Sequence, residues 1–228
     1  MTEDTQKKLF SAQRLKGYAS PKEHEANFTL IASISHKIGI LEVVIRNKID
    51  SILLEKKGDW WQHLPQNIHI TGDPTCKEDL VSKQSMGFWL KVVECFKIYD
   101  KLFDLDFLDR LNFKRYCSQN KNRFGNKTSL KPCKKAHLKR YEKADLILQL
   151  LHALRNRAFH FENLYKYTPK GYPRLSVKIT DDKHRNKNQA PQLEKPQELY
   201  VALQPDKIQL FLDDLLESFN PGLVNYAK

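Results

Sequence analysis

The sequence predicts an all-α fold, a helical bundle that ends in a small C-terminal β-hairpin and a final helix. Two observations lead to this class. Apolar residues recur every three or four positions over long stretches between residues 20 and 160, which is the period of a helix with one buried face. Beyond residue 173 apolar and polar residues alternate, as in strands. With 228 residues, we expect a single domain over 1–228 that can bury a sizeable core.

The first long helix is predicted from Ser20 to about Lys57. Ser20 can cap the helix, Pro21 suits the first helical position, and Glu23 completes a capping box. Behind this start, one apolar face runs through seven residues at helical spacing. These are Phe28, Ile31, Ile38, Leu41, Ile45, Ile49 and Ile52.

Two further long helices and a short one follow. The second is predicted from about Ser85 to Phe103, with a short helical piece at 105–112. The third is predicted over about 134–158, and its nearly continuous apolar run at 146–151 indicates burial deep in the bundle.

The C-terminal part changes period. Alternating apolar residues near 175–179 and 199–203 predict two antiparallel strands joined by a polar loop at 180–197, a hairpin appendage within 173–204. A final helix is predicted over about 206–219.

Most of the excess positive charge lies in one segment. The chain carries 39 Lys and Arg against 27 Asp and Glu, a net charge of +12, yet eleven bases and one acid, Glu142, fall between Lys114 and Lys143. We expect a basic loop at 114–135 in which rings and amides interleave with cations, a composition that suits phosphate contacts and base stacking. The interleaved residues are Tyr116, Asn120, Asn122, Phe124, Asn126 and Tyr141. The cations expected to contact RNA are Lys121, Arg123, Lys127, Lys131, Lys134, Lys135, Lys139 and Arg140.

The alternative is a solvated loop whose bases pair with acids just upstream. Those acids are Asp100, Asp104, Asp106 and Asp109. Four carboxylates cannot neutralise eleven bases, so the charge favours a nucleic-acid partner.

Other classes of protein are disfavoured. The four cysteines, at 76, 95, 117 and 133, form no CxxC pair, and we expect reduced thiols. Cys133 and His137 could share one helix turn as zinc ligands, but two more ligands are not evident. We therefore expect no metal and no cofactor.

The apolar windows are interrupted by charge and Met1–Asp4 does not open a secretory signal, so we expect a cytoplasmic protein without a membrane span.

The third helix carries a polar stripe beside its apolar face. Asp145, Gln149, His152, Asn156 and His160 fall on one arc. Any half-buried helix shows such a stripe to water. Here, however, the stripe contains two imidazoles, and the adjacent Arg155 at the apolar margin needs a partner or an anion.

Arg155, Asn156 and His160 form a set that can act on a phosphodiester. A guanidinium can grip the phosphate and hold transition-state charge, an imidazole can transfer a proton, and an amide can orient either group. A second proton-transfer group is missing from one copy, and a two-fold dimer would supply it.

The same residues resemble a known family. Arg155-Asn156-x-x-x-His160 matches the RNxxxH form of the motif of HEPN domains, all-helical bundles that dimerise around it. Leu154–Leu164 resembles the Abi-like (abortive infection) branch, as do the aromatic pair and glutamate within Met86–Glu94 and the "LE…RN" pattern of Leu41–Asn47. The resemblance covers roughly residues 20–165. This chain departs from the branch in two ways. It has a single histidine, His160, within Ala158–Phe161, and it has Lys97 near a position where relatives have glycine.

The resemblance implies a metal-independent endoribonuclease that serves as a toxin in antiphage defence or a toxin–antitoxin pair. It implies an RNA substrate, a homodimer and, as in some relatives, an RNA or protein antitoxin. Arg155 and His160 would be catalytic and Asn156 would support them, giving a 2′,3′-cyclic phosphate and a 5′-hydroxyl. An alternative is a non-catalytic HEPN module that binds RNA or a nucleotide. A DNA-binding regulator is disfavoured because no helix-turn-helix pattern is present.

Five further residues are candidates for support of the site. Glu42 and Arg46 stand four apart and would otherwise form an ordinary pair on a helix surface, with Asn47 beside them. Glu94 could approach Arg46 or Arg155 across the bundle. His152 could stand behind the motif, although a lone histidine of this kind is more often a satisfied helix residue.

Overall fold

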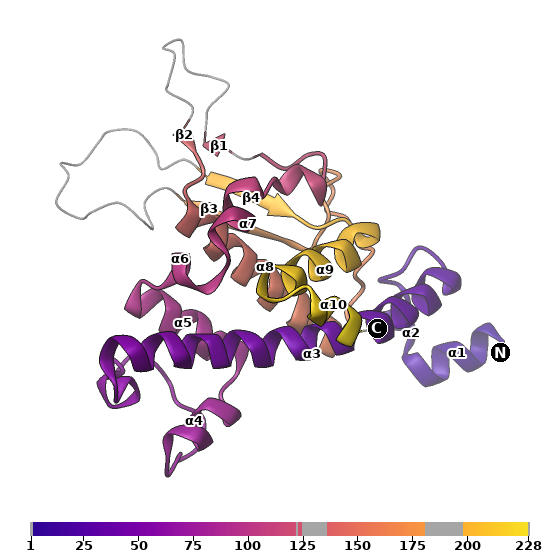
Figure 1. Ribbon diagram of the computed structural model, residues 1–228. Helices are drawn as coiled ribbons and strands as arrows, with labels where there is room; N and C mark the ends of the chain where they lie inside the picture. Colours follow the sequence, from indigo (N-terminus) through magenta and orange to yellow (C-terminus); the bar gives the residue numbers. More distant parts are fainter. Residues whose placement is uncertain (1, 122, 125–135, 181–197, 228) are drawn as a thin grey trace, which may run out of the picture.

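The computed structural model describes residues 2–121, 123–124, 136–180 and 198–227. Within these residues the chain is mostly helical and has two small antiparallel sheets of two strands each, an arrangement compatible with the predicted all-α class (Figure 1).

The described chain consists of helices of very different length, with two pairs of short strands before and after α8. The α-helices are α1 (Glu3–Phe10), α2 (Ala12–Leu15), α3 (Pro21–Lys57), α4 (Lys77–Lys83), α5 (Met86–Phe96), α6 (Tyr99–Leu102), α7 (Leu105–Arg110), α8 (Arg140–Phe159), α9 (Ile208–Phe219) and α10 (Gly222–Tyr226). The 3-10 turns are η1 (Trp60–His63), η2 (Phe113–Arg115) and η4 (Pro205–Lys207), and the strands are β1 (Arg123–Phe124), β2 (Ala136–His137), β3 (Ser176–Thr180) and β4 (Glu198–Ala202).

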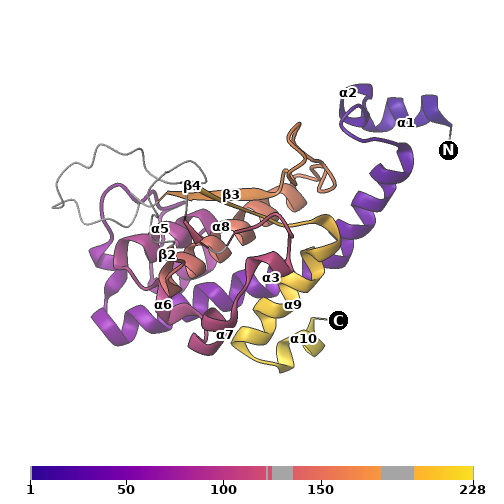
Figure 2. The same cartoon turned by 90° about the horizontal axis from the view of Figure 1, so that it is seen from above.

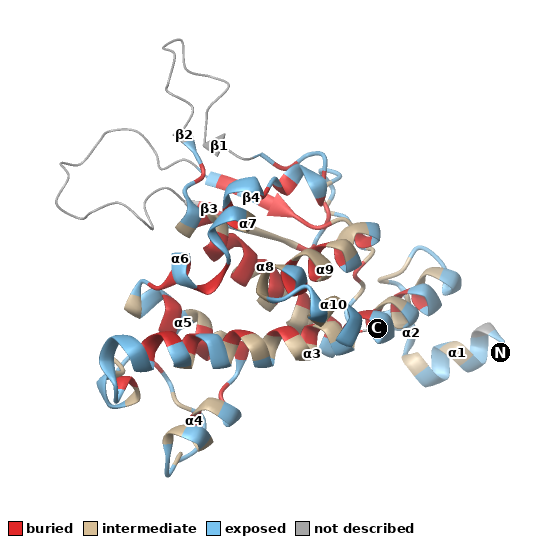
Figure 3. Cartoon of the chain, in the orientation of Figure 1, coloured by how far each residue is buried: buried red, intermediate tan, exposed pale blue. Residues whose placement is uncertain are grey.

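Helix α3 is the long spine of the fold and confirms the first predicted helix. The Ser20 hydroxyl accepts the Glu23 backbone N–H at 3.2 Å, as its sequence predicts. The apolar face of α3 is buried from Ile31 to Leu53 and packs against α5, α6, α8 and α9 (Figure 3). This packing sets α3 and α8 side by side, which decides where the site residues of both helices lie.

Helix α3 also meets the length and apolarity of a membrane span, contrary to the expectation drawn from the sequence. One 18-residue window has a mean hydropathy of 1.7, and 33% of that window is buried inside the fold. Core helices of globular proteins and N-terminal signal sequences pass the same test, so this is weak evidence for a membrane.

The second predicted helix is broken in two. Helix α5 ends at Phe96, and Lys97 adopts the left-handed conformation at φ 53° and ψ 47°, so that α6 restarts at Tyr99 in a new direction. The left-handed region favours glycine because it has no Cβ. A glycine would therefore suit the helix stop that Lys97 makes in this chain.

Replacing Lys97 by glycine is expected to stabilise the fold by about 0.5–1 kcal/mol, because it relieves the left-handed strain without removing a contact. Urea denaturation should give a higher midpoint for Lys97→Gly. Lys91→Gly is the matched control: this exposed residue lies inside α5, and its replacement should cost about 1 kcal/mol. A loss of stability in both variants would contradict the assigned helix stop.

The region expected to be a basic loop is partly packed into the fold. Tyr116 and Asn120 are each 1% exposed, so neither can serve in base stacking as predicted. The Tyr116 hydroxyl donates to Asp214 of α9 at 2.8 Å. The Asn120 side chain donates to the carbonyls of Phe113 and Ala202 and accepts the Ala202 N–H. This part of the segment therefore joins α9 and β4 to the bundle.

Helix α8 begins later than predicted, at Arg140, because residues 136–137 pair with β1 as strand β2. Its capping box is made by the Glu142 side chain, which accepts the Lys139 N–H at 2.7 Å. From Ala144 to Leu154 most of the helix is buried, which confirms the prediction of a deeply packed helix. Asp145, expected on the polar arc, is itself buried at 5% exposure.

The predicted hairpin is confirmed, but it belongs to the core. Strands β3 and β4 pair antiparallel with Val177 opposite Val201. Ile179, Leu199 and Val201 are buried in the same apolar cluster as α8, against which β3 packs. Burial of one face of the hairpin explains its strict alternation.

The N-terminal arm, α1 and α2, lies beyond the start of α3 and was not predicted. Its helices are short and mostly exposed, so they lack the buried face that makes a helix visible in a sequence. Figure 2 shows this arm set off at the end of the long α3 helix.

Candidate functional site

The Arg155–His160 motif lies at the C-terminal end of α8 and is open to solvent. Arg155 and Asn156 are half-buried, with 32% of the Arg155 side chain exposed. His160 is the C-terminal capping residue of α8 and is exposed. Solvent therefore reaches the side chains of both Arg155 and His160 in a single protomer. No contact between these two side chains is found in the described part of the chain.

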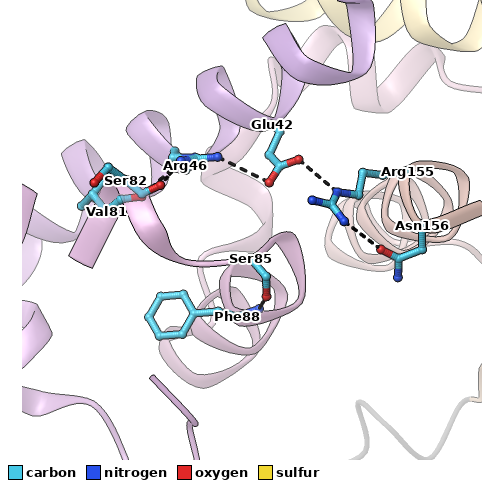
Figure 4. Close-up of polar contacts among 8 residues, drawn as sticks. All are labelled: Glu42, Arg46, Val81, Ser82, Ser85, Phe88, Arg155 and Asn156. Atoms are coloured by element: carbon cyan, nitrogen blue, oxygen red, sulfur yellow. Dashed lines mark hydrogen bonds and ion pairs between the residues drawn. The ribbon is translucent and has the colours of Figure 1, made fainter. Parts of the chain in front are cut away.

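Glu42 joins two arginines from different helices. Its carboxylate accepts a hydrogen bond from Arg155 Nε at 3.3 Å and from Arg46 Nη2 at 3.4 Å. Arg46 also donates to the Ser82 carbonyl at 2.7 Å, so that its side chain is held between α3 and the end of α4 (Figure 4). The ion pair of Glu42 and Arg46 therefore links α3 to the end of α4, and Glu42 also contacts Arg155 of the motif.

Asn156 connects Arg155 to His152. Arg155 Nη1 donates to Asn156 Oδ1 at 3.5 Å, and Asn156 Nδ2 lies 3.0 Å from His152 Nε2. Because the amide nitrogen donates, Nε2 accepts when the ring is neutral. The pKa of His152 is lowered, mainly by burial and secondly by the positive charge of Arg155. The negative charge of Glu42 opposes this shift. His152 thus stands behind the motif as a neutral acceptor.

Gly87 at the start of α5 makes room for this arrangement. A Cβ at position 87 would lie 3.4 Å from His152 Nε2, at van der Waals contact, so side chains larger than alanine would meet the ring that contacts Asn156. The aromatic pair that the sequence analysis singled out, Phe88 and Trp89, faces the core and anchors α5 beside α8.

Acidification is expected to destabilise the fold partly through His152. Since the folded pKa lies below the unfolded value of 6.5, the unfolded chain gains a proton first as pH falls, and stability declines with it. His152→Gln should show a smaller loss of stability than the parent between about pH 7 and pH 5.5. The comparison uses urea midpoints, with exposed His63→Gln as control. An unchanged pH dependence in His152→Gln would contradict the buried neutral state.

Helix α8 ends in a Schellman turn with an unusual residue. Glu162 N–H donates to the Arg157 carbonyl at 2.9 Å and Phe161 N–H to the Ala158 carbonyl at 3.0 Å. The residue after the cap is normally glycine, but here it is Phe161 at φ 52°. A left-handed non-glycine residue costs roughly 1–2 kcal/mol.

Side chains from the N-terminal region hold this turn. Arg14 Nη2 donates to the His160 carbonyl at 3.0 Å. Asn27, fully buried, donates through Nδ2 to the Glu162 carbonyl at 3.1 Å, and its Oδ1 accepts the Leu164 N–H at 2.9 Å. The segment that carries His160 is therefore fixed by α2 and by the first turns of α3.

The sequence analysis missed Arg14 and Asn27. For Asn27 a signal exists: it occupies the same helix face as Ile31, Ile34 and Ile38, and a polar residue within a buried stripe indicates a buried hydrogen-bond anchor. Arg14 has no such signal, because its partner lies 146 residues away.

Two predicted supporting residues do not join the site. Asn47 is exposed and lines a different, open cavity of about 740 Å³ between α3, α6 and the end of α9. It projects away from Glu42 because five residues turn a helix by about 140°. Glu94 is exposed and, among the described residues, forms no ion pair with Arg46 or Arg155.

The cations predicted to bind RNA begin at the other end of α8. Arg140 and Arg155 are fifteen positions apart, or about 22 Å along the helix. Arg140 forms an ion pair with Asp109 through two nitrogens, as the alternative interpretation of the charge proposed, and this contact lowers the pKa of Asp109. Lys121 and Lys139 are exposed. The side chain of Arg123, and Lys127, Lys131, Lys134 and Lys135, lie outside the described residues, as does Cys133 of the possible zinc pair.

Among the described residues no group of three His, Cys, Asp or Glu side chains could hold a metal ion. A second open cavity, of about 890 Å³, lies between α7, η2 and α9, and neither cavity is lined by Arg155, Asn156 or His160.

Comparisons with protein-family models, with curated proteins and with solved structures give no significant match.

Proposed function

We propose that this chain is a metal-independent endoribonuclease of the Abi-like HEPN type, a cytoplasmic toxin of antiphage defence or of a toxin–antitoxin pair. Arg155 binds and stabilises the reacting phosphate, His160 transfers the proton to or from a ribose 2′-hydroxyl or leaving 5′-oxygen, and Asn156 orients Arg155. The products are a 2′,3′-cyclic phosphate and a 5′-hydroxyl.

The observation that carries the proposal is the exposed edge formed by Arg155, Asn156 and His160 at one helix end. Arg155 is half-buried against Glu42 yet keeps 32% of its side chain exposed, so the guanidinium can still meet an anion. The His160 imidazole has no hydrogen-bond partner in the described part of the chain and is free to transfer a proton.

The proposal includes a homodimer. One protomer supplies one exposed imidazole, whereas cleavage by 2′-hydroxyl attack uses a base and an acid. Two copies related by a two-fold axis would bring two His160 side chains to one shared cleft.

The test is incubation of the purified protein with bulk RNA and tRNA in excess EDTA. We expect cleavage to persist, and end analysis of the fragments should show cyclic phosphate and 5′-hydroxyl groups. Toxicity of the gene on expression, relieved by an antitoxin RNA or protein, would be the cellular counterpart. Cleavage that stops in EDTA and returns with a divalent cation would contradict the mechanism.

The contact between Glu42 and Arg155 favours a second candidate, a non-catalytic module that binds RNA or a nucleotide. A carboxylate at 3.3 Å offsets part of the guanidinium charge, so Arg155 has less charge to give to a transition state and its hydrogen-bonding nitrogens remain for simple binding. Salt-dependent RNA binding without turnover, unchanged in His160→Ala, would support this function instead.

A further inference from the structure

Two aromatic rings flank His160 and face solvent. Phe159 is 43% exposed and Phe161 is 42% exposed. The Phe161 ring stacks on Phe28 at 5.4 Å between centroids and 21° between planes. The Arg155 guanidinium lies 5.2 Å from the centre of the Phe159 ring. Exposed phenyl rings thus occur on both sides of the imidazole in the chain.

The left-handed backbone conformation at position 161 disfavours phenylalanine relative to glycine. Phe161 occupies the left-handed position of a Schellman turn, where glycine forms the same two hydrogen bonds without strain. Backbone strain that is maintained beside a candidate catalytic group is a reason to look for a use of the side chain.

Arginine side chains from other parts of the chain lie near this turn, together with Glu162. Arg14 and Arg174 are exposed, and in the described part of the chain neither has an acidic partner within ion-pair distance. Arg157 is paired with Glu162 at 3.1 Å and lies close enough to Arg174 for the two charges to interact. Two exposed rings, with the exposed guanidinium of Arg14 at the same turn, offer the two kinds of group that contact single-stranded RNA, flat rings for the bases and cations for the phosphate backbone.

We propose that Phe159 and Phe161 each stack on an unpaired base beside the phosphate that Arg155 binds, so that these two residues determine the selection of unpaired over paired RNA. This inference rests on the proposed function and adds two specificity-determining residues to it. In a duplex the bases stack on one another and are not available to the rings, so the selection follows from geometry and needs no sequence readout.

The test measures binding in a His160→Ala background, which prevents cleavage. The ligands are a single-stranded RNA of about 12 nucleotides, its duplex, and a single strand of the same length that lacks bases. The variants are Phe159→Leu with Phe161→Leu, Phe161→Gly alone, and Phe161→Trp. Tyr200→Leu is the matched control, since this exposed ring lies on the outer face of β4. Phe161→Gly removes the ring and the backbone strain together, so it separates the loss of a ring from a folding defect.

We expect the double leucine variant to bind the single strand about tenfold more weakly. It should bind the base-free strand and the duplex within about twofold of the parent, because the phosphate contacts remain. Phe161→Gly should show part of the same loss with no fall in melting temperature, because the strain is relieved. Phe161→Trp should keep the affinity, and Tyr200→Leu should change nothing.

Two results would overturn the inference while leaving the proposed function in place. The first is RNA cleavage by the parent with an equal effect of the phenylalanine variants on all three ligands. The second is a change of oligomeric state in the double leucine variant without a change in base-dependent binding, which would assign the rings to the contact between two copies. If the parent neither cleaves nor binds RNA, the proposed function fails, and the inference with it.

Discussion

Replacing His160 with alanine is expected to lower the rate of RNA cleavage at least about a hundredfold, because the imidazole is the only proton-transfer group in the motif. The fold should not change. Among the described residues, the hydrogen bonds of His160 come from its backbone: its N–H donates to the Asn156 carbonyl and its carbonyl accepts from Arg14. Alanine keeps both contacts, so the free energy of unfolding should stay within about 0.5 kcal/mol of the parent.

The measurement is initial cleavage rate in EDTA together with a melting curve for each protein. His63→Ala is the matched control, because this exposed histidine lies on η1, away from the motif. Arg155→Ala should be at least as impaired as His160→Ala, since the guanidinium is the group that meets the phosphate. If both motif variants cut RNA as fast as the parent, the roles assigned to these residues are wrong.

Helix periodicity predicted α3 and α8 well because both helices bury one face over many turns. It failed at Lys97, where the apolar period continues through a residue that turns the chain. The charge pattern, in turn, failed at Tyr116 and Asn120. The charge of the surrounding segment indicates a solvated loop, whereas two side chains within it are buried by partners on α9 and β4.

In the candidate site, too, local patterns could be predicted from the sequence and long-range contacts could not. The Arg155–His160 motif is a local pattern over the last turn and the cap of one helix and could be found from spacing alone. The contact of Arg155 with Glu42 joins positions 113 residues apart, and the sequence could only suggest that Arg155 needs some partner. The predicted pair of Glu42 and Arg46 forms, but both side chains are largely buried and do not lie on an open helix surface, and the same carboxylate also contacts the motif arginine.

Replacing Asn27 with alanine is expected to lower the free energy of unfolding by about 2–4 kcal/mol. Asn27 is fully buried, and it satisfies the Leu164 N–H and the Glu162 carbonyl, while also donating to the Tyr18 hydroxyl at 3.2 Å. Alanine would leave the two backbone groups without partners in a place that water reaches poorly, and each such group costs about 1–3 kcal/mol.

Thermal melting should therefore show Asn27→Ala at a midpoint lower by several degrees. Asn47→Ala is the matched control: it removes an exposed asparagine from the same helix and should be neutral or slightly stabilising, because alanine favours helix. Cleavage by Asn27→Ala should also fall below the parent at temperatures where the variant is fully folded, since the released turn carries His160. Equal stability of Asn27→Ala and Asn47→Ala would show that the turn is held by Arg14 and the Schellman hydrogen bonds alone, and the buried amide would then have no part in placing the imidazole.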